Sequence, residues 1–234
     1  MLRRIINRLR GKTKVVEVND DNTCTFVFTD QVCTAPDGSF DPGANVAGGL
    51  TMDGAAKAAM CLTAHFMPKV QEAGIPTHFI ECDHEKGTIL VKQVTVIPVE
   101  WIWRSKSWGS FCKSFGVEQG MVFNPPVVET TLKDDPLGDP RICEDAVIAI
   151  KKITREQYQQ CDTWTRQLGC LLHSMLQEHG YELIDLKFEY GLDTDGNLML
   201  IDEISGNIFR CLDKDGKSAN PVDIAKTICP QYYQ

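Results

Sequence analysis

Three charged side chains lie two residues apart in the last third of the chain. Asp185, Lys187 and Glu189 alternate with Leu186 and Phe188. An extended strand would therefore place the charges on one face and the apolar residues on the other. Such a face can bind a polar ligand, or it can be the ordinary solvated side of a two-faced strand. The pattern alone leaves both interpretations open.

A tight turn is predicted to fold the chain back after this strand. The dipeptide Asp195-Gly196 is a strong hairpin signal, and the apolar run 198–201 follows it. A reversal between Asp195 and Gly196 would place Glu189 opposite Asp202. Two facing carboxylates repel each other unless a cation lies between them. Mg²⁺ held by one or two carboxylates and by phosphates is the ion that suits this arrangement.

Two lysines near the N-terminus could bind the phosphates of such a ligand. Lys12 and Lys14 flank Thr13 beside Gly11, which lets a ligand approach the backbone closely. The Gly-Lys-Thr-Lys sequence lacks the first glycine of a P-loop, so that motif is excluded. Two solvated lysines on an edge strand remain an equally good interpretation.

A second phosphate site is suggested by arginines and a hydroxyl. Arg104 ends a predicted strand, and Ser110 follows at the expected start of a short helix. A guanidinium, a hydroxyl and backbone N–H groups together suit a phosphate monoester. Arg210, just past the hairpin, could complete the group, although a surface salt bridge explains each arginine taken singly. Asp37 and Lys133 lie in predicted loops and are weaker candidates.

Composition is that of a globular protein. The 234 residues are 43% hydrophobic and 24% charged, enough for a sizeable core in one domain or two lobes. A net charge of −8 argues against a nucleic-acid or membrane surface. The ten cysteines form no Cys-x-x-Cys motif, and no apolar run is long enough to span a bilayer. We therefore expect reduced thiols in a cytoplasmic protein.

Apolar periodicity predicts the elements that position these residues. In the first half we expect a loop over 30–49, a helix over 53–73, and strands over 15–18, 23–29, 77–82 and 88–96. In the second half, a capping box at Thr154 and Gln157 begins a long helix that ends at Gly180. A short helix is expected from Pro221. A lobe boundary at Pro98 gives an N-terminal lobe, 1–97, and a C-terminal lobe, 98–234.

Taken together, these segments resemble the SAICAR synthetase family in content and order. The matching segments are Gly11-Lys12-Thr13-Lys14, Gly74-Ile75-Pro76-Thr77-His78, Leu90-Val91-Lys92, Ile97-Pro98-Val99-Glu100, Arg104, Gly109-Ser110, Leu137-Gly138-Asp139-Pro140, Asp185 to Gly191, Asp202-Glu203-Ile204-Ser205 and Arg210. The resemblance runs from about residue 10 to about residue 214. It implies an α+β fold with an antiparallel N-terminal lobe, a mixed α/β C-terminal lobe and an ATP cleft between them.

The resemblance also implies a reaction. The expected activity is that of an ATP-dependent carbon–nitrogen ligase of de novo purine biosynthesis. It would join L-aspartate to the carboxylate of 5-amino-4-carboxyimidazole ribonucleotide (CAIR) through an acyl phosphate, giving SAICAR, ADP and phosphate. ATP would be the co-substrate, Mg²⁺ the cofactor and small molecules the partners, with a homo-oligomer allowed. Transfer between anions needs charge neutralisation and in-line positioning more than covalent help from the protein.

Roles can be carried over to the positions that match the family's motifs. Mg²⁺ would be held by Glu189 and Asp202, and Asp185, Lys187 and Asp37 would lie near the reacting centre. The remaining ATP-binding residues implied are Lys12, Lys14, Val91 and Lys92, and those for the ribonucleotide are Arg104, Ser110, Arg210 and Lys133.

The chain departs from the family pattern at a few positions. Trp103 and Trp108 replace an aliphatic and a small residue, and Gly206-Asn207 replaces Pro-Asp. Trp108 and Asn207 fall where the ribonucleotide is expected, so the pocket is expected to be reshaped while the ATP and metal residues are retained. Two alternatives therefore stay open: a related amide ligase with an altered ribonucleotide or amine, and a nucleotide-binding pseudoenzyme.

Overall fold

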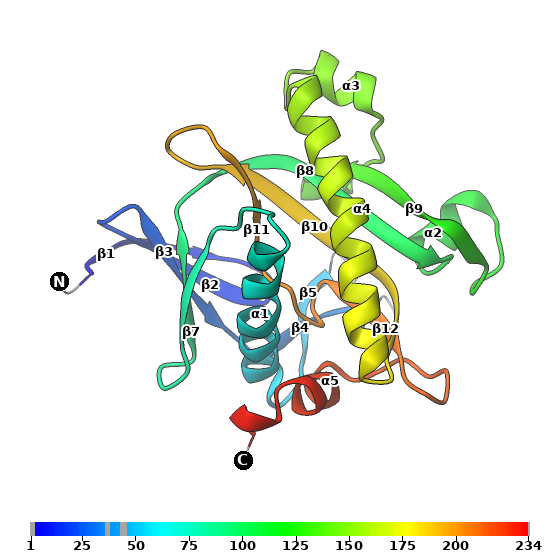
Figure 1. The fold of residues 1–234 in the computed structure, drawn as a ribbon, viewed down its shortest axis with the longest axis horizontal. Helices are drawn as coiled ribbons and strands as arrows, with labels where there is room; N and C mark the ends of the chain where they lie inside the picture. Colours follow the sequence, from blue (N-terminus) through cyan, green and yellow to red (C-terminus); the bar gives the residue numbers. More distant parts are fainter. Residues whose placement is uncertain (1–2, 36–37, 43–45, 234) are drawn as a thin grey trace. The chain divides into compact units, whose positions relative to one another are not determined.

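The chain folds into two compact units. The computed structural model describes residues 3–35, 38–42 and 46–233 (Figure 1). One unit takes in the chain up to Thr95 together with Leu192–Asn207 and the segment from Asn220 onward, and the other takes in Val96–Gly191 and Ile208–Ala219. The break after Thr95 lies close to the predicted boundary. The last part of the chain differs from the prediction, because it is divided between the two units.

An antiparallel sheet forms the first unit. Its strands follow the order β1-β2-β3-β7-β6, and each neighbouring pair is antiparallel. The strands are β1 (Ile5–Arg10), β2 (Lys14–Asn19), β3 (Thr23–Phe28), β6 (Phe79–Asp83) and β7 (Thr88–Lys92). In β3, buried Cys24, Phe26 and Phe28 alternate with threonines and Val27, as the period of a strand with one buried face requires.

The predicted loop over 30–49 is wrong in part. Strand β4 (Gln31–Thr34) lies within this range, and strand β5 (Val46–Thr51) begins within it and ends beyond it. The two strands pair antiparallel. Val32 and Cys33 are buried, so β4 belongs to the core. The glycines and prolines that suggested a loop lie between the two short strands, where a connection is needed.

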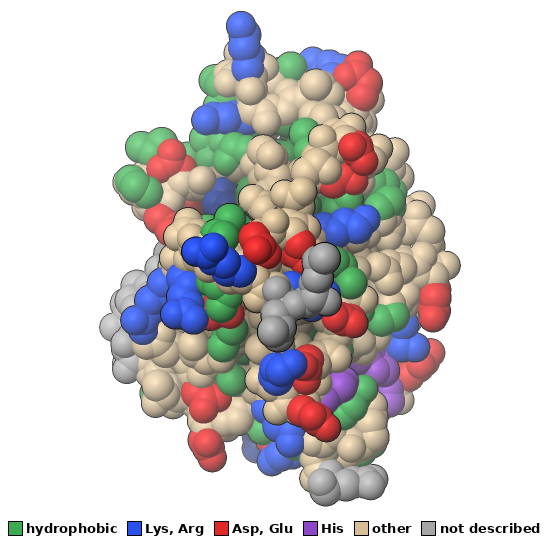
Figure 2. All heavy atoms as spheres, turned by 90° about the vertical axis from the view of Figure 1, so that its left-hand side faces the viewer, with side chains coloured by type: hydrophobic (Ala, Val, Ile, Leu, Met, Phe, Trp, Pro, Cys, Tyr) green, Lys and Arg blue, Asp and Glu red, His purple; other side chains and the backbone are tan. Residues whose placement is uncertain are grey.

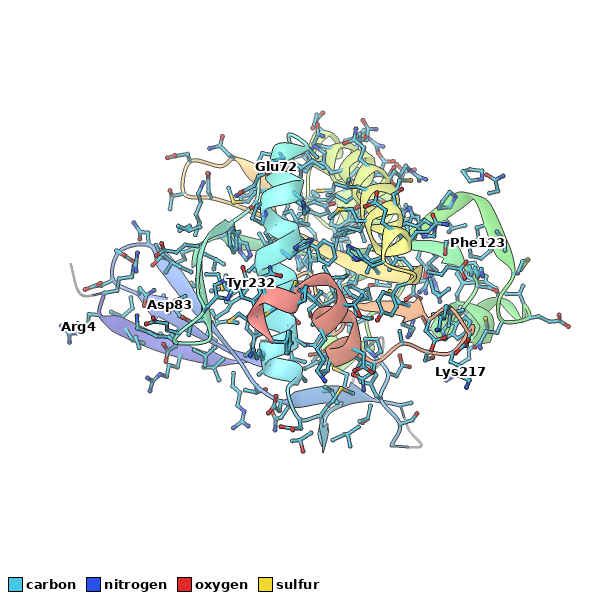
Figure 3. All side chains as sticks on the ribbon, turned by 60° about the horizontal axis from the view of Figure 1, so that its bottom comes forward. Arg4, Glu72, Asp83, Phe123, Lys217 and Tyr232 are labelled. Carbon is cyan, nitrogen blue, oxygen red and sulfur yellow. The ribbon has the colours of Figure 1, made fainter. Side chains whose placement is uncertain are left out.

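Helices complete the first unit. α1 (Ala55–Glu72) contains Pro68 and buries an alanine-rich face, as the composition predicted. α5 (Pro221–Ile228) and the short η2 (Pro230–Tyr232) follow near the C-terminus; Figure 3 labels Tyr232, whose ring stacks on that of His84. β11 (Leu198–Ile201) is tied to this unit by a parallel bridge between Leu200 and Thr77.

A second sheet forms the other unit. β8 (Thr95–Lys106) lies between β9 (Val122–Leu132) and β10 (Glu182–Leu192), and β12 (Phe209–Leu212) pairs with β10. The 24-residue helix α4 (Arg155–Glu178) runs across one face, as Figure 1 shows. The predicted capping box of Thr154 and Gln157 is present at its start. Three short helices, α2 (Ser110–Phe115), η1 (Asp135–Leu137) and α3 (Glu144–Ala149), occupy the connections.

Alternation along β8 separates core from polar residues. Val99, Trp101 and Trp103 are buried on the side of α4, where a Cβ at Gly169 would come within 2.2 Å of the Trp103 ring. Glu100 and Arg104 take the alternate positions and therefore the opposite face. Trp103 is a core residue packed on α4, so its departure from the family pattern is matched by a glycine on the helix.

No helix among the described residues is long and apolar enough to cross a membrane. On the face drawn in Figure 2, basic and acidic side chains are interspersed.

Candidate active site

One face of the second unit's sheet carries five of the predicted site residues. Directly opposed residues on paired strands share a face, and the register pairs Glu100 with Thr131 and Asp185 with Arg210. The polar side chains of this face are Glu100 and Arg104 on β8, Glu129 and Thr131 on β9, Asp185, Lys187 and Glu189 on β10, and Arg210 on β12. The alternation seen in β10 alone therefore extends across four strands.

Arg104 lies at the centre of one cluster on this face. Although it carries a charge, it is only 1% exposed. Its Nη1 donates to Asp185, and its Nε donates to Oε1 of Glu129 at 2.8 Å. Its Nη2 donates to Ser110 Oγ at 3.5 Å. Charge-assisted bonds to two carboxylates offset the cost of burying the guanidinium.

Arg210 joins the same cluster. Its Nη1 donates to Oδ2 of Asp185 at 2.7 Å, so both arginines use one carboxylate. Gly109 lies against Arg210: a Cβ there would be 3.1 Å from Nη2, and its φ of +54° is unfavourable for other residues. The structure thus brings together Arg104, Ser110 and Arg210, which the sequence suggested as a group.

Lysines and glutamates form a second cluster. Lys187 Nζ lies 2.9 Å from Glu100 Oε1 and 2.8 Å from Glu189 Oε1. Lys133 Nζ lies 2.5 Å from both carboxylate oxygens of Glu189. The Glu189 side chain is nearly buried, whereas the Lys133 side chain is 44% exposed. Two ammonium groups therefore neutralise the carboxylate that the sequence assigned to the metal.

The first unit holds the other predicted carboxylate. Lys14 Nζ lies 2.6 Å from Asp202 Oδ1 and 3.6 Å from Glu203 Oε2, and 5.1 Å from the centre of the Phe26 ring. Asp202 has a φ of +69°, an uncommon backbone conformation that aspartate tolerates better than most residues. Strain of this kind persists where the surrounding structure enforces it, and functional sites are common examples.

His78 links the backbone of Asp202 to the backbone of Lys92. Its Nε2 lies 3.0 Å from the carbonyl oxygen of Asp202, and its own carbonyl accepts from Lys92 N at 2.7 Å. The ring is buried and packs edge-on against Phe26. These contacts give His78 a structural role. Val91, beside Lys92, is buried on β7, while Lys92 is exposed.

The hairpin turn differs by one residue from the prediction. Asp193 N donates to the Asn197 carbonyl and Gly196 N to the Asp193 carbonyl, so the reversal is centred on Asp195. This is a three-residue loop with Gly196 at φ +82°, the common alternative to a two-residue turn. The reversal predicted between Asp195 and Gly196 is therefore wrong by one residue.

The donor chemistry of the two carboxylates suits Mg²⁺, which prefers oxygen ligands. Glu189 and Asp202 each contact an ammonium group, so each site accommodates positive charge. Over the described ranges, no group of three or more His, Cys, Asp or Glu side chains is placed to hold a metal by itself. Mg²⁺ would therefore need ligands from substrate phosphates, as it does in many phosphoryl-transfer sites.

Some residues of these clusters were not predicted, and one predicted residue is not among those that the structure describes. Asp37 lies outside the described residues. Glu100 and Glu129 were not singled out, although Glu100 keeps the alternation of buried and partly exposed residues along β8. Arg141 was also missed, because it lies in a connection with no pattern of its own. It lies 2.7 Å from Oε2 of Glu129 through its Nε.

The Gly206-Asn207 departure has a local explanation. A Cβ at Gly206 would approach Cβ of Pro221 within 2.4 Å, so the first turn of α5 excludes any larger residue there. Asn207 is buried, and its backbone N–H donates to Ser205 Oγ at 3.1 Å. Packing against α5 accounts for the glycine.

Comparison with known proteins gives one answer. A model of the SAICAR synthetase family matches residues 7–228. The phosphoribosylaminoimidazole-succinocarboxamide synthase of Clostridium tetani is 39% identical over 224 residues, which is 94% of this chain and 97% of that protein.

Solved structures share the fold. A SAICAR synthetase in complex with ADP superposes with a TM-score of 0.84 at 24% identity, covering 96% of this chain and 98% of that one. The phosphoribosylaminoimidazole-succinocarboxamide synthase of Ehrlichia chaffeensis gives 0.83 at 23% identity, covering 98% of each chain. The α+β fold expected from the sequence is confirmed.

Proposed function

Since this chain belongs to the SAICAR synthetase family, we propose that it joins L-aspartate to the carboxylate of CAIR with cleavage of ATP to ADP and phosphate. The product is SAICAR, an intermediate of de novo purine biosynthesis. The observation that carries this proposal is the family match across residues 7–228, over which the clusters around Arg104 and Glu189 are also assembled.

The reaction proceeds in two steps, phosphoryl transfer and then amide formation. A carboxylate oxygen of CAIR attacks the γ-phosphorus of ATP, the bond to the bridging oxygen breaks, and ADP leaves. The amine nitrogen of L-aspartate then attacks the acyl carbon, phosphate leaves with the former carboxylate oxygen, and the nitrogen loses a proton. Both steps bring anions together, so positively charged side chains must offset their repulsion.

The ATP end of the reaction is assigned to the first unit's lysines and to the two carboxylates. Lys12 and Lys14 would bind phosphate oxygens, and Val91 with Lys92 would lie along the adenine. Glu189 and Asp202 would hold Mg²⁺, which neutralises phosphate charge when bound. The support is the Lys14–Asp202 contact of 2.6 Å, which places a phosphate-binding ammonium beside a proposed metal ligand.

The ribonucleotide end is assigned to the arginine cluster. Arg104, Ser110 and Arg210 would bind the 5′-phosphate of CAIR, and Asp185 holds both guanidinium groups in place. Lys133 would also contact this substrate.

Lys187 is assigned to the reacting carboxylate. It is held between Glu100 and Glu189, and these two contacts orient its ammonium group. Asp37, outside the described residues, is proposed near the reacting centre on the resemblance alone.

A coupled assay of ADP release tests the proposed reaction. We expect turnover that requires both CAIR and L-aspartate together with ATP and Mg²⁺. ADP release only with another amine or ribonucleotide would support a related ligase instead. Nucleotide binding without turnover across a substrate panel would indicate a pseudoenzyme.

A further inference from the structure

α2 is held by little apolar packing. The helix has only six residues, none of them buried, and no side chain caps its start. A helix of that length is unstable by itself in water, so its position depends on tertiary contacts. One contact is the Phe111 ring, whose centre lies 5.1 Å from that of Phe123, labelled in Figure 3.

Two arginines contact opposite ends of α2. Arg104 reaches Ser110 Oγ at 3.5 Å and lies 5.7 Å from the Phe111 ring. Arg141 donates to Ser114 Oγ at 2.6 Å and lies 4.9 Å from the Phe115 ring. Polar and cation–π contacts of this kind fix where the helix, and therefore Ser110, lies.

Glu129 connects these two arginines. Oε1 accepts from Nε of Arg104 at 2.8 Å and lies 2.7 Å from its Nη2, and Oε2 accepts from Nε of Arg141 at 2.7 Å. The Glu129 side chain is 11% exposed, so water screens these contacts only weakly. A single carboxylate therefore sets the orientation of a buried guanidinium and of the helix beside it.

We propose that Glu129, acting with Arg141, is a positioning residue for the 5′-phosphate of the ribonucleotide. This proposal rests on the proposed function, in which Arg104 and Ser110 contact that phosphate. Without the Glu129 charge, Asp185 is the one carboxylate left among the contacts described for Arg104, and Arg104 shares it with Arg210. Arg104 would then turn toward Asp185, and α2 would lose the link to β9 that runs through Arg141 and Glu129. Phosphate binding weakens, while the groups assigned to ATP are not touched.

Steady-state kinetics of the full-length protein tests the proposal. Glu129→Gln keeps the shape of the side chain and removes its charge. We expect the KM for CAIR to rise about tenfold, with the KM values for ATP and L-aspartate and kcat changed less than about threefold, as loss of uniform binding predicts. Glu182→Gln is the matched control, because it removes an ion pair with Lys106 on the same sheet. A uniform change in all parameters, or none, would overturn the proposal.

A double-mutant cycle separates positioning from general destabilisation. Arg141→Met should raise the KM for CAIR less than Glu129→Gln does, and its effect should be smaller in the Glu129→Gln background than in wild type, because Arg141 shares the Glu129 carboxylate with Arg104. Additive effects would contradict this path. If Glu129→Gln fails to fold, Glu129→Asp and Arg141→Met decide, since each keeps part of the network.

Binding of ribose 5-phosphate, measured by calorimetry, distinguishes this proposal from the proposed function. If wild type binds ribose 5-phosphate but does not turn over CAIR, the proposed function fails, and a weaker affinity in Glu129→Gln still supports positioning. If wild type turns over CAIR and Glu129→Gln binds ribose 5-phosphate equally well, positioning alone fails. If wild type does not bind ribose 5-phosphate, the positioning role of Glu129 is also overturned.

Discussion

Charged residues of the candidate site share partners. Asp185 accepts from two guanidinium groups, and Glu189 contacts two ammonium groups. Removing one member leaves its neighbours imperfectly paired in a poorly solvated place, which costs more than an exposed ion pair would. Single substitutions here should therefore have selective and measurable effects.

Arg210→Ala should mainly raise the KM for CAIR. A phosphate handle remote from the reacting carboxylate contributes mostly uniform binding, so kcat should change little. A charge-assisted hydrogen bond of about 1.5–3 kcal/mol corresponds to about a 10- to 100-fold rise. Initial rates at a range of CAIR concentrations measure this KM. Lys106→Ala is the control for the loss of a cation on this sheet. An unchanged KM would argue against the phosphate role.

Asp202→Asn should abolish most Mg²⁺-dependent turnover without unfolding the protein. The amide is a poorer Mg²⁺ ligand and no longer carries the charge that Lys14 faces. We expect a rate loss of about 100-fold or more. Rates across a range of Mg²⁺ concentrations, together with thermal unfolding, measure both parts. Asp223→Asn, at an exposed position on α5, is the control for charge. Near-normal rates would refute the metal assignment.

At the scale of elements, packing of α4 separates the polar face from the core. The buried stripe on α4 includes Leu168, Gly169 and Leu172, and it covers the tryptophan side of β8. A glycine within a helix costs about 1 kcal/mol relative to alanine, so its presence needs a reason. The reason is Trp103, because its ring occupies the space that a Cβ at position 169 would need.

Gly169→Ala should therefore destabilise the protein, although the helix propensity of alanine is higher. The new Cβ would lie 2.2–2.5 Å from ring atoms of Trp103, and overpacking of this kind costs about 1–3 kcal/mol. Urea unfolding measures the change. Ser174→Ala, at an exposed position on α4, should be neutral or stabilising. Trp103→Leu should rescue Gly169→Ala, and failure of that rescue would rule out the steric explanation.

At the scale of the whole molecule, each unit is assembled from segments far apart in the chain. The first unit needs the turn after β10 and the C-terminal helix α5 as well as the N-terminal strands. Buried thiols hold part of this assembly: Cys61 on α1 and Cys229 after α5 are both buried, and Cys229 Sγ lies 3.6 Å from the Cys61 carbonyl. Stability of this unit should therefore respond to thiol ionisation.

Stability should fall in alkaline solution. Burial raises the pKa of Cys61 to about 11 and that of Cys229 to about 12. Below pH 9 both thiols are neutral in the folded and unfolded chains. Above it the unfolded thiols ionise first, so the free energy of unfolding falls by at most about 1.4 kcal/mol per pH unit per thiol.

Denaturant unfolding between pH 8 and pH 11 in a reducing buffer measures this loss. Cys229→Ala should make the pH dependence shallower. Cys170→Ala, at an exposed position, should leave it unchanged. Equal slopes for wild type and Cys229→Ala would refute the assignment.

Local sequence predicted several of the strands and helices, although not β4 and β5, and it predicted which β10 side chains share a face. The alternation Asp185, Lys187, Glu189 and the capping box at Thr154 are short-range patterns, so they were predictable without coordinates. The family resemblance added the order of motifs. The hairpin register could not be fixed, because two- and three-residue loops fit the same Asp-Gly signal.

Only the tertiary structure decided which distant residues meet. Lys14 lies beside Asp202 across 188 positions of sequence, and Glu129 joins Arg104 to Arg141 from a third segment. No local pattern encodes such pairs, because strand order and register depend on burying the tryptophan face of β8 against α4. Because this packing buries one face of the second sheet, the charged side chains of the candidate site lie on the opposite face.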